Sequence, residues 1–190
     1  CQALWTGDVD LALAGGVCVY STPGVFLAAR GADMLSARGR CQSFDASADG
    51  FVWGEGVAAM VLKRLEEALD AGDHIHGVIR ASGINQDGAT NGITAPSALA
   101  QEALQRAVYD GFGIDPARLQ LVEAHGTGTR LGDPIEFEAL TRSFRAYTDA
   151  VQFCALGTIK SNLGHTAAAA GITGVAKVLL ALRHRKIPAS

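Results

Sequence analysis

The sequence predicts a layered α/β fold, and three observations support this expectation. Short apolar runs typical of strands alternate along the chain with stretches that have helical spacing. Two glycine-rich loops, each containing one histidine, follow strand-like runs and precede helix-like ones. The composition, 48% apolar and 18% charged over 190 residues, is that of a tightly packed globular protein with a substantial core.

The N-terminal part of the chain is expected to hold two buried strands and two short helices. Residues 1–5 resemble a helix already under way, with no initiator Met and no capping residue before it. The apolar runs 9–19 and 56–63 predict buried strands, and the stretch 21–56 between them is rich in loop-forming residues. Residues 64–71 predict a short helix closed by a glycine.

The remainder predicts further strands alternating with helices. Residues 76–83, 119–124 and 151–159 are strand-like, and 85–92 is a turn-rich loop. Ser97 begins a predicted helix whose apolar residues lie near helical spacing. No domain boundary follows from composition, and the loop 72–76 is the best candidate for one.

The stretch 166–182 predicts a helix rich in small residues. Small side chains on all sides favour a helix squeezed between two layers, where backbones approach closely. It is also the most apolar stretch of the chain. Because Gly171, Thr173, Gly174 and Lys177 interrupt it, we predict no membrane span.

Charge and cysteine usage exclude several function classes. A net charge of −3 provides no basic surface for nucleic acid or for an anionic membrane. The cysteines show neither CxxC spacing nor nearby Cys/His partners, so we expect neither a disulfide framework nor a metal site. Free thiols in a reducing cytoplasm are the favoured interpretation for all of them, namely Cys1, Cys18, Cys41 and Cys154.

His125 and His165 are the candidate functional residues. Each follows a predicted strand, and loops beyond the carboxyl ends of strands converge on one crevice in open α/β folds, so a single site is expected. A neutral imidazole can donate a hydrogen bond to a developing oxyanion or take a proton near pH 7. Lys160 could hold an imidazole neutral, pair with a carboxylate such as Glu136, or lie solvated, and the sequence favours the solvated alternative.

The run Asp133-Pro134-Ile135-Glu136 predicts a helix start, with Asp133 as N-cap, proline at N1 and Glu136 at N3. Two interpretations of Asp133 and Glu136 therefore remain open: a purely capping role, or a role in the functional site. Nucleotide binding is a weak hypothesis, because neither histidine loop has GxGxxG or Walker spacing.

The two loops, Glu-Ala-His-Gly-Thr-Gly-Thr (123–129) and Lys-Ser-Asn-Leu-Gly-His-Thr (160–166), resemble the histidine motifs of β-ketoacyl synthases. The resemblance is closest to ketosynthase domains of modular type I polyketide synthases. Segments 44–56, 84–88 and 91–96 agree with it in the same order along the chain. It covers essentially the whole sequence.

This resemblance implies a thiolase-like fold, an αβαβα sandwich of two similar halves that is usually a homodimer. Residues 1–72 are similar to the later part of the N-terminal half, and residues 73–190 to most of the C-terminal half. The chain is therefore expected to be incomplete at both ends.

The resemblance also implies a decarboxylative Claisen condensation of an acyl thioester with a malonyl-type extender, in polyketide or fatty acid biosynthesis. An acyl carrier protein would deliver the substrates on its phosphopantetheine arm, with no cofactor bound directly, and neighbouring polyketide synthase domains would be further partners. The positions that match the catalytic residues are His125, His165 and Lys160; the supporting positions are Glu136, Thr127 and Thr129.

Two features of the family are missing from the chain, the nucleophile motif and the closing glycine-rich loop of the active site, which is expected beyond Ser190. The nucleophilic cysteine followed by serines is absent, and Cys1 matches a later part of the helix that carries it. A thiol there would lack the helix N-terminal field that lowers a cysteine pKa. We therefore expect the isolated chain to be inactive. The alternatives are a decarboxylase-type relative, whose parent has another residue in place of the cysteine, and a catalytically silent partner subunit.

Overall fold

The computed structural model describes residues 1–90, 92 and 95–190. Asn91, Ile93 and Thr94 of the expected loop 91–96 lie outside the described residues. The strands are β1 (Leu11–Cys18), β2 (Gly56–Lys63), β3 (Leu121–Glu123) and β4 (Ala155–Gly157). The helices are α1 (Gln2–Trp5), α2 (Gly24–Gly31), α3 (Leu65–Asp70), α4 (Ala98–Phe112), α5 (Gly132–Arg145), α6 (Lys160–Leu163) and α7 (Ala170–His184), with short 3₁₀ helices η1 (Pro116–Arg118) and η2 (Ala167–Ala169).

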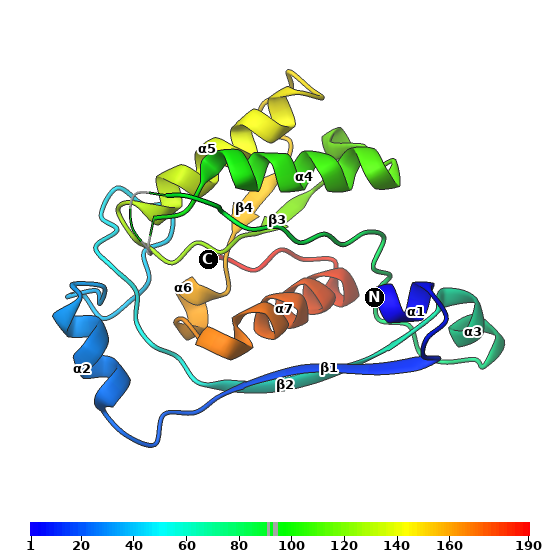
Figure 1. The fold of residues 1–190 in the computed structure, drawn as a ribbon, viewed down its shortest axis with the longest axis horizontal. Coiled ribbons are helices and arrows are strands. Elements are labelled where there is room, and N and C mark those ends of the chain that lie inside the picture. Colours follow the sequence, from blue (N-terminus) through cyan, green and yellow to red (C-terminus); the bar gives the residue numbers. More distant parts are fainter. Residues whose placement is uncertain (91, 93–94) are drawn as a thin grey trace.

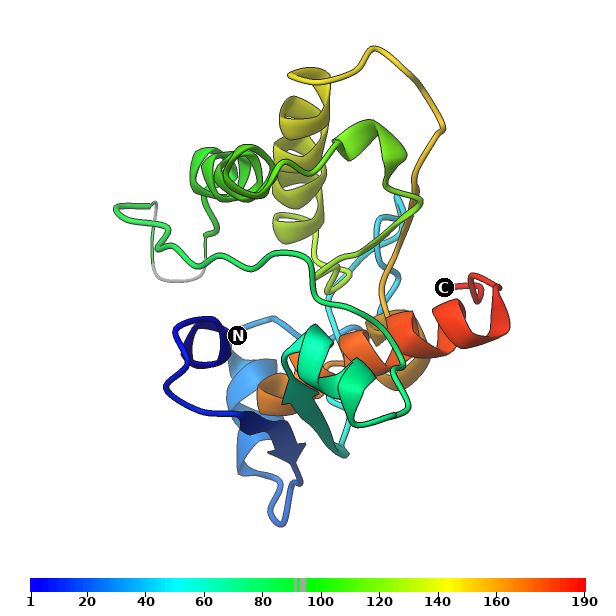
Figure 2. The ribbon, with the colours of Figure 1, turned by 90° about the vertical axis from the view of Figure 1, so that its right-hand side faces the viewer.

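These elements form layers. β1 pairs antiparallel with β2, and β3 pairs parallel with β4, with Glu123 opposite Gly157. Helix α7 lies between the two sheets, and α4 and α5 lie on the other side of β3 and β4 (Figure 1). Figure 2 shows α4 and α5 side by side, apart from the layer that contains α7. The expected layered α/β class is confirmed.

Small residues allow α7 and η2 to approach both sheets, as expected. A Cβ added at Gly16 of β1 would lie 2.8 Å from the carbonyl oxygen of Ala168. On the opposite side, a Cβ at Gly174 would lie 3.3 Å from Cγ of Glu123. The glycines therefore set how closely the layers pack.

The stretch Ala167–His184 has a mean hydropathy of 1.2, and by length and composition alone it could cross a membrane. In this fold it packs against β1 and β2, and its Lys177 is buried in an ion pair with Glu123. The helix is thus held between the two sheets, although only 22% of the stretch is buried.

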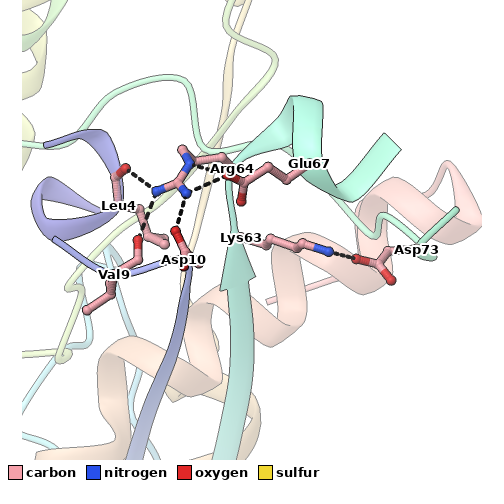
Figure 3. Close-up of polar contacts among 7 residues, drawn as sticks. All are labelled: Leu4, Val9, Asp10, Lys63, Arg64, Glu67 and Asp73. Atoms are coloured by element: carbon pink, nitrogen blue, oxygen red, sulfur yellow. Dashed lines mark hydrogen bonds and ion pairs between the residues drawn. The ribbon is translucent and has the colours of Figure 1, made fainter. Parts of the chain in front are cut away.

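Arg64 joins the N-terminal elements (Figure 3). Its Nη1 donates to the carbonyl oxygens of Leu4 and Val9, at 3.0 and 2.8 Å. The same guanidinium pairs with Asp10 at 2.5 Å and with Glu67. One side chain thereby connects α1, the entry to β1 and α3.

Several expected elements are confirmed by their end signals. Ser97 accepts a hydrogen bond from the N–H of Ala100, 3.2 Å away, and caps α4. Gly72 follows the end of α3 at φ +68°, a left-handed backbone conformation that glycine adopts readily and other residues disfavour. β1 and β2 lie within their predicted ranges.

Other expectations are wrong. β1 and β2 are not buried on both faces: Leu13 and Val57 are 76% and 71% exposed, because only one face of this sheet packs on α7 and η2. Helix α2 lies inside the stretch expected to be loop, and its N-terminus has no side-chain cap that would have announced it. Residues 76–83 belong to neither sheet, and β3 and β4 are shorter than predicted.

Candidate active site

The fold brings the two histidines together. His125 follows β3, and His165 lies between α6 and η2. Their ring centroids are 5.5 Å apart and the ring planes make an angle of 86°. The predicted convergence of the two loops therefore occurs, at the carboxyl ends of the paired strands β3 and β4.

The segment 44–56 supplies the wall behind His165. The backbone N–H of His165 donates to the carbonyl oxygen of Val52 at 2.7 Å, and its carbonyl accepts from Gly54 N–H at 3.1 Å. The rings of Phe51 and Trp53 lie 5.4 and 5.6 Å from the imidazole, centroid to centroid. Two backbone bonds and two aromatic rings thus fix the position of this histidine.

Both imidazoles are neutral near pH 7. Burial, together with the charge of Lys160 and the neighbouring His125, lowers the pKa of His165 to about 4. Desolvation and the charge of Lys160 also lower the pKa of His125, although this residue is partly exposed to solvent, against the opposing effect of Glu136 and Asp133. Nδ1 of His165 accepts a hydrogen bond from Ala167 N–H at 3.1 Å, so its proton resides on Nε2. Nε2–H is therefore free to act as a donor.

Lys160 is buried, and the prediction that it is solvated is wrong. It begins α6 and is only 4% exposed, and the ionisable groups that act on its charge include Glu136, Glu123, Cys41 and Asp133. Burial lowers its pKa, while the charges of Glu136 and Glu123 oppose this shift. Its ammonium is thus a buried positive charge that disfavours protonation of both histidines.

Glu136 organises the first histidine loop. Its two carboxylate oxygens accept hydrogen bonds from the backbone N–H groups of His125 and Gly126, at 2.7 and 2.8 Å. The purely capping alternative for Glu136 is wrong, because its acceptors serve the loop that precedes the helix. This contact sets the backbone from which the His125 side chain projects.

Asp133 has a similar task, and its expected role as N-cap is also wrong. Helix α5 begins at Gly132, whose N–H donates to Oγ1 of Thr129 at 3.1 Å. Asp133 instead accepts from Gly128 N–H at 3.1 Å and from Phe44 N–H at 2.7 Å. It thereby joins the histidine loop to segment 44–56.

The two threonines of the loop lie close together. The Oγ1 atoms of Thr127 and Thr129 are 3.1 Å apart, and Thr127 is buried. An open pocket of about 250 Å³ borders this loop, lined by residues of α4 and α5 together with His125. It offers a space next to one of the two imidazoles.

Two polar residues at the site were not anticipated from the sequence. Lys177 of α7 and Glu123 of β3 form a buried ion pair, with Nζ and Oε2 2.8 Å apart. The available signal was a lysine in the middle of an otherwise apolar helix, a position where charges are rare unless paired.

The four cysteines are free thiols. Burial raises the pKa of both Cys41 and Cys154. Among the described residues, no group of three or more His, Cys, Asp or Glu side chains could hold a metal ion.

Comparison with protein families covers nearly the whole chain. The β-ketoacyl synthase N-terminal domain matches residues 1–68, and the β-ketoacyl synthase C-terminal domain matches residues 76–190. Polyketide synthase PksL of Bacillus subtilis is 55% identical over 186 residues, covering 98% of this chain and 4% of PksL. Polyketide synthase GfsE of Streptomyces halstedii is 49% identical over 189 residues, covering 100% of this chain and 5% of GfsE.

Solved structures agree. The ketosynthase from module 6 of the bacillaene synthase of Bacillus subtilis superposes with a TM-score of 0.95 at 56% identity, covering 96% of this chain. The oxazolomycin ketosynthase domain of Streptomyces albus superposes with a TM-score of 0.93 at 41% identity, covering 97%. The chain spans 33% of each of these structures. The expected thiolase-like fold class is confirmed.

Proposed function

Because this chain belongs to the β-ketoacyl synthase family, we propose that it carries the decarboxylating and oxyanion-binding part of a ketosynthase active site in a polyketide synthase. The reaction is the decarboxylative Claisen condensation of an acyl thioester with a malonyl-type extender. The observation that carries this proposal is the pairing of two neutral imidazoles, His125 and His165, 5.5 Å apart.

The two imidazoles bind the oxygen on which charge develops. Cleavage of the extender's carbon–carboxylate bond releases CO₂ and places the electron pair on the thioester enolate. Nε2–H of His165 and a second N–H from His125 stabilise this oxyanion, each donor contributing about 3 kcal/mol in sites of this kind. The enolate carbon then attacks an acyl group held as a cysteine thioester, the thiolate leaves, and a β-ketoacyl thioester results.

Lys160 affects the protonation of the two imidazoles, and Glu136 affects the position of His125. The buried ammonium of Lys160 opposes protonation of both rings, which keeps them as neutral hydrogen-bond donors. Glu136 holds the His125 backbone and interacts electrostatically with Lys160. Thr127 and Thr129 are proposed to lie along the phosphopantetheine arm of the substrate.

The proposed partners follow from this substrate. An acyl carrier protein delivers the thioesters on its phosphopantetheine arm, neighbouring polyketide synthase domains exchange them, and a second copy forms a homodimer. We assign residues 1–72 to the N-terminal ketosynthase half and residues 73–190 to the C-terminal half, in a cytoplasmic enzyme.

We further propose that the isolated 190-residue chain does not condense acyl groups. Covalent catalysis needs an activated thiol, and burial raises the pKa of Cys41 and Cys154. Cys18 is buried. Cys1 is exposed at the N-cap of α1, contrary to the expectation that it lies further along a helix, but α1 has only 4 residues and provides little of the N-terminal field that lowers a thiol pKa. β-Ketoacyl product formed by this chain alone would contradict the proposal.

The decisive experiment uses a complete ketosynthase domain that contains this chain. CO₂ release from a malonyl thioester and β-ketoacyl formation from an added acyl thioester are measured separately, in the parent domain and in His165→Ala. Both rates should fall together in the variant. Decarboxylation without condensation in the parent domain would identify a decarboxylase-type relative, and neither activity would identify a silent subunit.

A further inference from the structure

A buried ion pair joins β3 to α7, the two elements that flank the histidine loops. The side chains of Glu123 and Lys177 are 11% and 3% exposed. Their charged atoms meet at 2.8 Å, without the alignment of a hydrogen bond. Burying two charges carries a desolvation penalty that their attraction often fails to exceed, so such a pair is weak evidence for a purely stabilising role.

The carboxylate of Glu123 contacts both ends of the segment that carries Lys160 and His165. Its Oε1 accepts a hydrogen bond from the N–H of Ile159 at 2.5 Å, immediately before Lys160. Its Oε2 holds Lys177, in the helix that follows His165. One side chain thereby contacts the chain on both sides of Lys160 and His165, at Ile159 and at Lys177.

Two glycines leave the space in which this pair lies. A Cβ on Gly174 would lie 3.3 Å from Cγ of Glu123, and a Cβ on Gly157 would lie 3.4 Å from Nζ of Lys177. Gly157 is also the residue opposite Glu123 in the β3–β4 register. Any larger side chain at these positions would press on the pair.

We propose that Glu123 and Lys177 are positioning residues of the ketosynthase site: the carboxylate, held in place by the ammonium, sets where Lys160 and His165 lie relative to His125. This inference rests on the function proposed above. Neither group acts on substrate; both act through the backbone between Ile159 and α7.

The electrostatics of the site provide a readout of this positioning. Lys160 and His125 are the charged or titratable groups that lower the pKa of His165, together with burial. The charge of Glu123 in turn acts to raise the pKa of Lys160. Movement of Lys160 away from the site would therefore return the pKa of His165 towards its ordinary value of 6.5.

The first test compares two double variants in the complete domain, Glu123→Gln/Lys177→Met and Glu123→Met/Lys177→Met. Both remove the two charges with little change in size, and only the first keeps an acceptor for Ile159 N–H. We expect the second to lose kcat for malonyl decarboxylation by on the order of tenfold to a hundredfold relative to the first, with similar KM and similar melting temperature. Equal kcat values for the two would overturn the proposal.

The second test needs no substrate. The pKa of His165 is measured by NMR titration in the same two double variants, which carry equal charge. A higher pKa in Glu123→Met/Lys177→Met than in Glu123→Gln/Lys177→Met supports positioning; equal pKa values overturn it. A wild-type domain without decarboxylase activity would refute the proposed function, and this titration would still decide the positioning role.

Discussion

The imidazole of His165 meets that of His125 edge to face, with ring centroids 5.5 Å apart and planes at 86°. The arrangement depends on the pairing of β3 with β4, which brings the ends of two strands together although they are distant in sequence. Lys160 lies close enough to oppose protonation of both rings. Near pH 7 the two imidazoles are therefore neutral hydrogen-bond donors, at the place where the proposed enolate oxygen would form.

Removal of the His165 imidazole should abolish one of the two hydrogen bonds to the proposed oxyanion. In the complete domain, His165→Ala is expected to lower the rate of malonyl decarboxylation by on the order of a hundredfold to a thousandfold. The matched control is His184→Ala, since His184 is exposed in the last turn of α7. Comparable rates for both variants would refute the role of His165.

Protonation of His165 should make folding stability depend on pH in a defined window. Its pKa is about 4 in the folded protein and 6.5 in the unfolded chain, so the unfolded state binds the proton more readily between these values. The contribution of His165 is complete above about pH 6.5 and is lost as the pH falls towards 4. Urea unfolding of the complete domain should show a shallower pH dependence in His165→Gln than in wild type over this window.

Glu136 is expected to stabilise the first histidine loop. Glu136→Ala leaves two backbone N–H groups without their acceptor, which should lower the free energy of unfolding by about 1–3 kcal/mol. Glu136→Gln keeps one acceptor and should lose less. Glu138→Ala, on the exposed side of the same helix, serves as the control. A loss in Glu138→Ala as large as that in Glu136→Ala would contradict this account.

Gly54 should not tolerate a side chain. A Cβ there would lie 2.1 Å from the carbonyl oxygen of Leu163, so Gly54→Ala must displace the backbone that is bonded to His165. We expect a lower melting temperature and reduced decarboxylation. Gly111→Ala is the matched control: nothing lies within 4 Å of its Cβ, and alanine is well tolerated in the last turn of α4, so the melting temperature should not fall. Equal melting temperatures for the two variants would contradict the close approach of the backbones at Gly54.

Parts of the fold and of the site were predictable because their signals are local. The apolar run of β2, the Ser97 cap of α4 and the glycine after α3 each act within a few residues of the element they define. Helix α2 was missed because it has no side-chain cap and a loop-like composition around it. The predicted strand at 76–83 was wrong because strand-like composition does not by itself supply a pairing partner.

The sequence by itself determined the layered α/β class, the two histidine loops and the family resemblance, since these depend on residue order and short-range spacing. Only the tertiary structure decided the burial of Lys160, the contacts of Asp133 and Glu136 with the loop backbone, and the Glu123–Lys177 pair. Each depends on which distant segments surround a charge. Burial and hydrogen-bond partners are properties of the packed layers, and no local pattern encodes them.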